Sequence, residues 1–270
     1  MMAAALQPVM AAARPDLEPD LICEACGRKK TRTVSFLGRT VVVACECDCD
    51  REKELERRKA QERTEAALRI NRMRSVGFPD VEMARLTFAQ DDGKTPQMTR
   101  IAKNYAANFR QALADGKGLV FYGSVGSGKT FAAAAIVNEL IDQGFPCLMT
   151  NVSRLVNMAS VAEEGRQAFY DRLNEYSLLV IDDFLSEWNT EYMVEQTLQI
   201  IDARYRARLP LIITTNLSGE QLKGGTNAID RERIYSRLAE MCVLVNSDGY
   251  DRRREISKQT IQKYGRILTS

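Results

Sequence analysis

Five short apolar runs recur from residue 119 onward, at 119–122, 147–150, 178–181, 211–215 and 242–245. Continuous apolar runs of this length are typical of strands that are buried on both faces of a parallel sheet. Longer stretches of helical character separate the runs, so strands and helices alternate along the chain. The pattern therefore predicts an α/β domain of three layers, with helices on both faces of a parallel sheet.

Charged residues dominate residues 51–75, which contain no Gly or Pro. Oppositely charged residues stand four apart, as Glu54 and Arg58 do, and this spacing places them on one face of a helix. A short apolar stripe near the end of the segment consists of Ala66, Ile70 and Met73. We expect a helical connector, which is either a solvated spacer with one docked end or a helix that binds a partner.

These patterns divide the chain into four segments. We expect a flexible N-terminus over residues 1–20, a cysteine-rich module over 21–50, the charged helical linker over 51–75 and a nucleotide-binding domain over 76–270. Residues 1–13 are apolar but carry no basic residue, so we expect no cleaved signal peptide. No apolar run approaches the roughly 18 residues that a membrane span requires.

A glycine-rich loop follows the first apolar run and opens an alanine-rich stretch. Glycines between a strand and a helix let the backbone N–H groups point at phosphate oxygens, and the helix dipole favours the same anion. The expected phosphate-binding residues are Gly123, Ser124, Val125, Gly126, Ser127, Gly128, Lys129 and Thr130. We expect Lys129 to reach the β- and γ-phosphates and the Thr130 hydroxyl to hold Mg²⁺. The loop thus predicts binding of ATP with Mg²⁺.

Carboxylates and an amide follow two of the other predicted strands. Asp182 and Asp183 end the run at 178–181, and Asn216 follows the run at 211–215. A carboxylate at the mouth of a parallel strand can hold the Mg²⁺ shell, and a second can polarise an attacking water. We therefore assign Asp182 to the metal and Asp183 to the catalytic base, with Asn216 as either a water-positioning residue or a turn residue.

Composition narrows the chemistry further. The chain has no histidine, which excludes Ser-His-Asp and Cys-His sites and requires any general base to be a carboxylate. A formal charge of +2 is too small to indicate a nucleic-acid partner by itself. Seven cysteines, most of them between residues 23 and 49, indicate metal chelation and a reducing cytoplasm.

The cysteine-rich module carries a C-x2-C pair and a later C-x-C-x-C cluster. The residues are Cys23, Cys26, Cys45, Cys47 and Cys49. Residues 31–36 and 40–43 flank a turn at 37–39, and such a hairpin would bring the two clusters together around a tetrahedral Zn²⁺. The spacing offers one thiol too many, so it leaves open which cysteines bind the metal.

The order of these motifs resembles the AAA+ helicase loaders of the DnaC/DnaI type. The resemblance covers residues 76–255 and is carried by five stretches: Gly77-Phe-Pro with Leu86-Thr-Phe, the acidic motif 182–187, the first-sensor region 201–216, residues 234–238 and residues 249–253. It implies a three-layer P-loop AAA+ ATPase core. Phe184-Leu-Ser stands where relatives usually have a glycine, and this departure weakens the assignment of Glu187.

The resemblance also implies roles for individual residues. Lys129 and Thr130 correspond to the Walker A contacts, and Asp182 and Asp183 to the Walker B pair. Asn216 corresponds to the first sensor. By the same resemblance Arg237 is the arginine finger that serves the ATP of a neighbouring subunit, which implies a homo-oligomer, and Arg253 is the second sensor. Loader-like zinc modules commonly end in C-x-C, which favours Cys23, Cys26, Cys45 and Cys47 as zinc ligands, with Cys49 as the alternative fourth.

The function that follows from the resemblance is a cytoplasmic, ATP-dependent loader of a replicative DNA helicase onto single-stranded DNA. An IstB-like transposition ATPase, which acts with a transposase on duplex DNA, shares the same core motifs. Two other classes stay open: a P-loop kinase of small molecules, and a zinc-dependent adaptor in which nucleotide only gates a clamp. Arg237 and Asn216 disfavour the kinase.

Overall fold

The computed structural model describes residues 21–36, 38–78, 80–163, 165–184, 190–223 and 229–268. The predicted N-terminal segment 1–20 therefore lies outside the described residues. The chain divides into two compact units, Met1–Leu68 and Arg69–Ser270, which are described separately. The division falls within the predicted linker.

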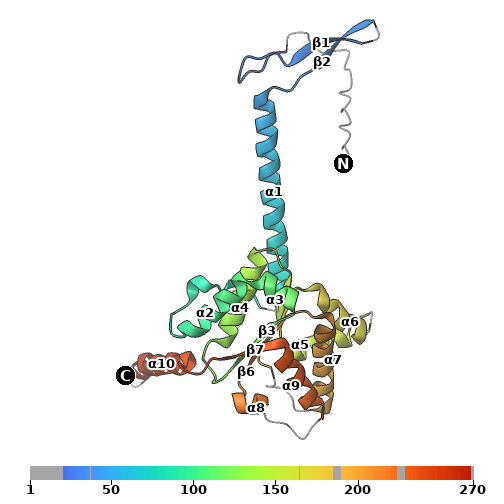
Figure 1. The fold of residues 1–270 in the computed structure, drawn as a ribbon. Coiled ribbons are helices and arrows are strands. Elements are labelled where there is room, and N and C mark those ends of the chain that lie inside the picture. The colour runs from blue at the N-terminus through green and yellow to red at the C-terminus, as the bar shows by residue number, and fades with distance from the viewer. Residues whose placement is uncertain are drawn as a thin grey trace. The chain divides into compact units, whose positions relative to one another are not determined.

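The first unit contains a two-stranded hairpin and most of a long helix (Figure 1). Strands β1 (Thr31–Phe36) and β2 (Arg39–Ala44) pair antiparallel, from Thr31 opposite Ala44 to Phe36 opposite Arg39. This pairing confirms the predicted hairpin. The helix α1 (Asp48–Gly77) confirms the helical connector, although it begins three residues earlier than predicted. Two acidic residues occupy its first turn, where they complement the positive end of the helix dipole.

The second unit is built on a five-stranded sheet with the order β4-β5-β6-β3-β7. The strands are β3 (Gly118–Tyr122), β4 (Cys147–Thr150), β5 (Leu178–Ile181), β6 (Leu211–Thr215) and β7 (Cys242–Asn246). All neighbouring strands pair in parallel. The predicted strands match within one residue at each end. Because parallel strands share one carboxyl edge, the loops after β3, β5 and β6 meet there.

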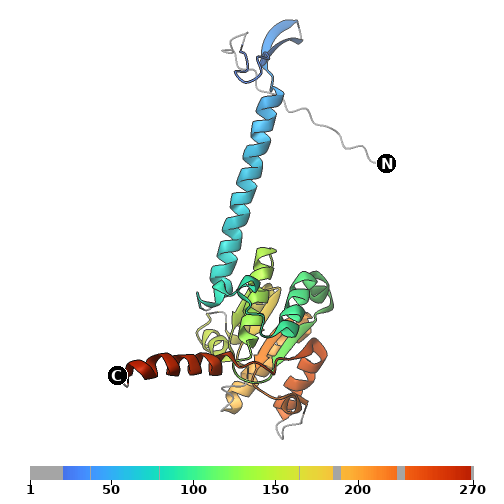
Figure 2. The same cartoon turned by 90° about the vertical axis from the view of Figure 1, so that its left-hand side faces the viewer.

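Helices cover both faces of this sheet (Figures 1 and 2). One face packs against α2 (Pro96–Ala107), α3 (Phe109–Asp115), α4 (Lys129–Asp142) and the end of α1, with the short turns η1 (Met83–Arg85) and η2 (Phe88–Gln90). The other face packs against α5 (Val152–Ser160), α6 (Arg166–Arg172), η3 (Leu173–Glu175), α7 (Glu191–Ala207) and α9 (Ile229–Met241). Alternate strand residues face the two layers, since Val120 belongs to one apolar cluster and Phe121 to the other. This confirms the three-layer α/β fold.

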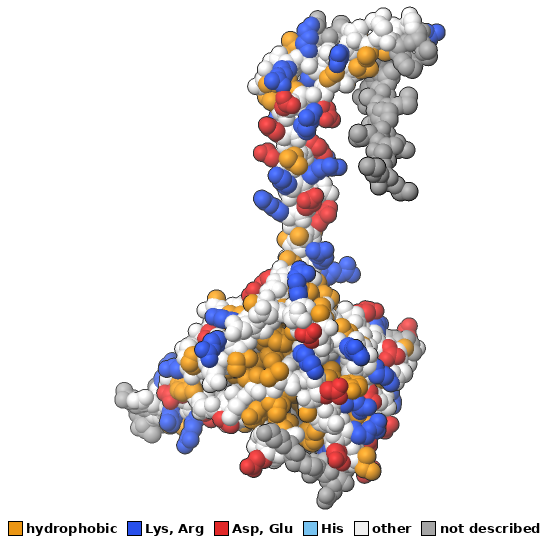
Figure 3. All heavy atoms as spheres, in the orientation of Figure 1, with side chains coloured by type: hydrophobic (Ala, Val, Ile, Leu, Met, Phe, Trp, Pro, Cys, Tyr) orange, Lys and Arg blue, Asp and Glu red, His pale blue; other side chains and the backbone are white. Residues whose placement is uncertain are grey.

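Two peripheral elements complete the unit. The short helix α8 (Gly219–Lys223) follows β6, and the C-terminal helix α10 (Arg252–Leu268) extends away from the sheet (Figure 2). The edge strand β7 is poorly covered, because the Val243 side chain is 60% exposed. Hydrophobic side chains gather on this face of the core in Figure 3. Among the described residues, no helix is both long enough and apolar enough to cross a membrane.

One buried charge ties the helical layer to the sheet. Arg204 of α7 is fully buried, and its guanidinium donates to the backbone carbonyl oxygens of Tyr176 (2.8 Å) and Pro210 (2.7 Å). Further bonds reach the carbonyl oxygens of Leu173 (3.2 Å) and Ser177 (3.4 Å). Burial lowers the pKa of Arg204 to about 9, because the charged form loses its hydration. The side chain thus satisfies the polar backbone of the loops that lead into β5 and β6.

Candidate nucleotide and metal sites

The predicted phosphate loop connects β3 to α4 and has the backbone of an anion-binding turn. Gly123, Gly126 and Gly128 have φ angles of 129°, 79° and 95°, which side chains with a Cβ rarely allow. A Cβ on Gly126 would also lie 2.1 Å from a carboxylate oxygen of Asp251. Glycine at this position is therefore required by both the turn and its packing.

Lys129 is the first residue of α4 and lies inside the loop. Its Nζ donates to the backbone carbonyl oxygens of Gly123 (2.8 Å) and Ser124 (2.7 Å). Burial lowers the pKa of Lys129, and the nearby carboxylates of Asp183 and Asp248 oppose that shift. The ammonium group is thus held at the loop, although its predicted contact with phosphate stays a prediction.

Thr130 and Asp182 meet as predicted. The Thr130 hydroxyl donates to Asp182 Oδ1 at 2.9 Å, across the gap between α4 and the end of β5. The hydroxyl of Thr214, in β6, donates to the same oxygen at 2.5 Å. Burial raises the pKa of the Asp182 carboxyl, while the bond from Thr214 opposes the shift. A buried carboxylate beside a hydroxyl supplies the oxygen ligands that Mg²⁺ prefers, so these residues fit the expected metal.

Asp183 has an unusual backbone. Its φ angle is 50°, in the left-handed region that few residues other than glycine adopt. The Asp183 N–H donates to the hydroxyl of Thr214 at 3.0 Å, which stabilises this conformation. The turn separates the two carboxylates, since Asp182 points to Thr130 while Asp183 lines the pocket in front of the loop.

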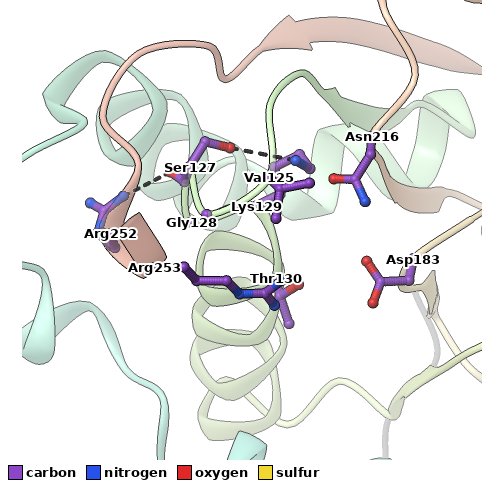
Figure 4. A pocket seen from close by; sticks show the side chains of 10 residues that line it. Val125, Ser127, Gly128, Lys129, Thr130, Asp183, Asn216, Arg252 and Arg253 are labelled. Carbon is purple, nitrogen blue, oxygen red and sulfur yellow. Dashed lines mark hydrogen bonds between the residues drawn. The ribbon is translucent and has the colours of Figure 1, made fainter. Parts of the chain in front are cut away.

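The pocket brings together residues from four parts of the chain (Figure 4). Its lining residues are Val125, Gly126, Ser127, Gly128, Lys129, Thr130, Asp183, Asn216, Arg252 and Arg253. Asn216 and Asp183 lie on the side opposite Arg252, and Arg253 points toward Thr130 (Figure 4). Arg252 is a pocket residue that the sequence did not single out, because three arginines follow one another at 252–254.

Arg237 lies on α9 and is not among the residues that line this pocket. It forms an ion pair with Asp202 of α7, and its guanidinium lies over the Tyr205 ring, 5.6 Å from the centroid. Only 22% of the Arg237 side chain is exposed. The predicted role as an arginine finger for a neighbouring subunit stays a prediction. Glu187 lies outside the described residues.

The first unit contains a cluster of four thiols. The Sγ atoms of Cys23, Cys26, Cys47 and Cys49 all lie within 4.8 Å of one another. The N–H of Gly27 donates to the Cys23 carbonyl oxygen at 2.8 Å, which closes a tight turn between the first two cysteines. Hydrogen bonds, first from the Cys26 backbone, lower the pKa of the Cys23 thiol to about 7. Burial raises the pKa of the Cys47 thiol to about 12, so it is the number and convergence of the four sulfur atoms that fit a tetrahedral thiolate site.

The cluster differs from the favoured ligand set at one position. Cys45 lies outside it, and the alternative residue Cys49 takes its place. The reason is that α1 already begins at Asp48, so Cys49 lies in the first helical turn beside Cys47. Cys45 instead extends the hairpin, because its N–H donates to the Lys30 carbonyl oxygen at 2.7 Å.

Comparisons with known proteins agree with this architecture. The profile of the IstB-like ATP binding protein family matches residues 47–259. The replicative helicase loader DnaI of Bacillus subtilis is 26% identical over 149 residues, which cover 51% of this chain and 48% of that protein. The replicative helicase loader DnaC of Escherichia coli K12 is 30% identical over 155 residues, 55% of this chain and 61% of that protein. The chain thus spans only about half to three-fifths of these relatives.

An insertion-sequence ATP-binding protein of Sinorhizobium fredii is similar to about the same degree, at 29% identity over 149 residues, 52% of this chain and 49% of that protein. Among solved structures, DnaI is 25% identical and superposes with a TM-score of 0.52, over 67% of this chain and 99% of that one. The DnaC helicase loader superposes with a TM-score of 0.53 at 23% identity, over 62% of this chain and 99% of that one. The second similarity shows the shared fold alone.

Proposed function

Because the chain belongs to the family of IstB-like ATP-binding proteins, we propose that it is an ATPase that loads a replicative DNA helicase onto single-stranded DNA. The helicase loaders DnaI and DnaC among its relatives support this choice. The observation that carries the ATPase part is the single pocket in which the loop residues, Asp183, Asn216 and Arg253 face one another. Phosphoryl-transfer sites combine these same chemical groups.

The proposal assigns a task to each of the predicted site residues. The N–H groups of the loop and the Lys129 ammonium bind the phosphates of ATP, and Thr130 and Asp182 would hold the Mg²⁺, which neutralises charge on the phosphates. Asp183 accepts the proton of the attacking water, and Asn216 orients that water. Arg253 contacts the phosphates from within the subunit. Arg237 completes the site of the next subunit in a homo-oligomer, where it stabilises the charge of the transition state.

We also propose that the four-thiol cluster binds Zn²⁺ through Cys23, Cys26, Cys47 and Cys49. In a tetrahedral site with Zn–S bonds of about 2.3 Å, neighbouring sulfur atoms stand about 3.8 Å apart. The Sγ atoms of Cys23 and Cys47 are 3.3 Å apart, so a small outward movement would admit the ion. Lys30 and Arg28 lie close by; each is paired mainly with a carboxylate, Asp50 and Asp48, and also attracts the thiolates. In this proposal the zinc module docks on the helicase in the cytoplasm.

The family name itself supports a second candidate. An IstB-like ATPase would use the same pocket while it acts with a transposase on duplex DNA, and the insertion-sequence relative supports this alternative. The two functions differ in partner and in DNA, since one requires a replicative helicase with single strands and the other a transposase with duplex.

The first experiment tests the partner. The purified protein is mixed with the replicative helicase of the source cell, with and without ATP and Mg²⁺, and the mass of the complex is measured by light scattering on a sizing column. We expect a complex that Cys26→Ser abolishes and Cys45→Ser preserves, because only Cys26 belongs to the cluster. Absence of any complex, together with ATP-dependent binding to duplex DNA, would favour the transposition ATPase.

A further inference from the structure

Arg252 makes more contacts with the phosphate loop than its position in a run of arginines suggests. Its backbone N–H donates to the Gly126 carbonyl oxygen at 3.0 Å. Its guanidinium donates to the Ser127 carbonyl oxygen at 2.8 Å (Figure 4). One residue of α10 therefore binds two successive carbonyl groups of the loop.

These two bonds orient the N–H groups that a phosphate would meet. The C=O and the N–H of a trans peptide point in opposite directions, and none of the described peptides is cis. When Arg252 holds the carbonyls of Gly126 and Ser127 toward its own edge of the pocket, the N–H groups of the same two peptides, those of Ser127 and Gly128, point away from Arg252. A bond from a cation also polarises the peptide and strengthens its N–H as a donor.

A second group of contacts holds the Arg252 side chain in place. Its Nε and one terminal nitrogen donate to the two carboxylate oxygens of Asp92, at 2.7 and 2.6 Å. The same terminal nitrogen donates to the hydroxyl of Thr95 at 3.0 Å. The Tyr250 ring lies beneath both Arg252 and Lys94, at 5.8 and 5.3 Å from ring centroid to cation. A bidentate pair of this kind fixes both distance and direction.

The Arg252 guanidinium is the main cause that lowers the pKa of the Asp92 carboxyl below its usual range. The Arg252 side chain is 22% exposed and that of Asp92 40%. A lysine could not reproduce these contacts, because an ammonium cannot bind a carboxylate and a carbonyl on opposite edges of one plane.

We propose that Arg252 is a positioning residue that pre-orients the phosphate loop for ATP, and that Asp92 acts through it by fixing the guanidinium. The proposal rests on the proposed function only in naming ATP as the ligand. Arg252 and its neighbour Arg253 then have different tasks. Both line the pocket, but Arg253 points toward Thr130, whereas Arg252 lies at another edge and binds the backbone carbonyl of Ser127 (Figure 4).

The test compares Arg252→Gln, Arg252→Lys, Asp92→Asn and the double variant Asp92→Asn/Arg252→Gln in the full chain. We expect the Kd for ATP with Mg²⁺, measured by calorimetry, to rise roughly 10- to 100-fold in both Arg252 variants, the range of one hydrogen bond to a charged group. Asp92→Asn weakens binding less. The double variant binds like Arg252→Gln alone, because Asp92 acts only through Arg252. The matched control Arg254→Gln, two residues along α10 and exposed, leaves Kd unchanged.

A second readout needs no nucleotide. In protein labelled with ¹⁵N-glycine, we expect one sharp amide signal each for Gly126 and Gly128 in the wild type, and broadened or multiple signals in Arg252→Gln. An unchanged Kd with unchanged glycine signals would overturn the proposal, as would additive effects of Asp92→Asn and Arg252→Gln. If the wild type bound no ATP, the proposed function would fail, while the glycine spectra would still decide the role of Arg252.

Discussion

The two units of the chain are held together in different ways. In the described part of Met1–Leu68, the buried residues are Cys23, Thr31 and Cys47, so two of the three are thiols of the cluster. Arg69–Ser270 instead buries two apolar clusters, one on each face of the sheet. A hairpin and the exposed part of a helix remove too little apolar surface from water to offset the chain entropy lost on folding. We therefore expect the first unit to depend on the proposed zinc ion, and the second on its core.

The difference also separates two kinds of function. The core holds a rigid sheet beneath the pocket. Side chains such as Asp183 and Arg253 are therefore held close to the geometry that the chemistry requires. In the proposal a single zinc ion shapes the cysteine module, which suits a docking element whose fold can be lost without loss of the ATPase. The following changes test this contrast, from those expected to unfold one unit to one expected to affect neither.

The largest effect should come from breaking the metal site. With Cys26→Ser, or with a zinc chelator, we expect residues 21–47 to unfold completely, since structural zinc contributes about 10–16 kcal/mol in small modules. Hydrogen exchange followed by mass spectrometry would show loss of protection in the hairpin β1–β2. The Tm of the core and its ATP turnover should stay unchanged.

The control for that experiment is Cys45→Ser. Cys45 belongs to the hairpin but not to the cluster, so zinc content and hairpin protection should persist. Loss of zinc from Cys45→Ser together with retention by Cys49→Ser would instead restore Cys45 as the fourth ligand and refute the cluster seen here.

A mutation of Arg204 should destabilise the second unit alone. Arg204→Met keeps much of the volume but leaves the carbonyl oxygens of Tyr176 and Pro210 buried without donors. We expect a loss of roughly 3–5 kcal/mol in the free energy of unfolding, measured by urea titration of the core. Arg206→Ala, an exposed position on the same helix, should change it by no more than about 0.5 kcal/mol. Equal effects of the two variants would contradict the role assigned to Arg204.

A change in Asp183 should affect chemistry and spare both folds. Asp183→Asn removes the proposed base while keeping the size of the side chain, so ATP turnover should fall on the order of 100-fold. Binding of ATP should persist, because the loop and Lys129 are untouched. Turnover that is unchanged in Asp183→Asn would transfer the role of base to another group. Measuring ATP turnover with and without single-stranded DNA would also show whether the protein hydrolyses ATP rapidly to drive a reaction or slowly as a nucleotide switch.

The sequence predicted most of the second unit because its signals are local. A buried strand needs only a continuous apolar run, and β3 begins one residue before the predicted 119 while β7 ends one residue after the predicted 245. The phosphate loop and the pairing of Thr130 with Asp182 follow from the shared carboxyl edge of parallel strands.

What the sequence left open or did not identify has two causes. Cys49 depended on where α1 begins, and helix ends are poorly defined by periodicity. The roles of Arg204 and Arg252 depend on carbonyl acceptors in segments far away along the chain. For Arg252, the Ser127 carbonyl lies 125 residues earlier. Residue type alone presents both as ordinary surface arginines.

The smallest effect should come from the ion pairs on the exposed part of α1, where Lys, Arg, Asp and Glu alternate in Figure 3. Arg57 donates to both carboxylate oxygens of Glu54, at 2.9 Å each, and the bond lowers the pKa of the Glu54 carboxyl. Water and salt screen a pair this exposed. We therefore expect Glu54→Gln to leave zinc content, helical circular dichroism and Tm unchanged at physiological salt. A clear loss of helix would mean that ion pairs share the task assigned here to the metal, and the contrast between the two units would then be one of degree.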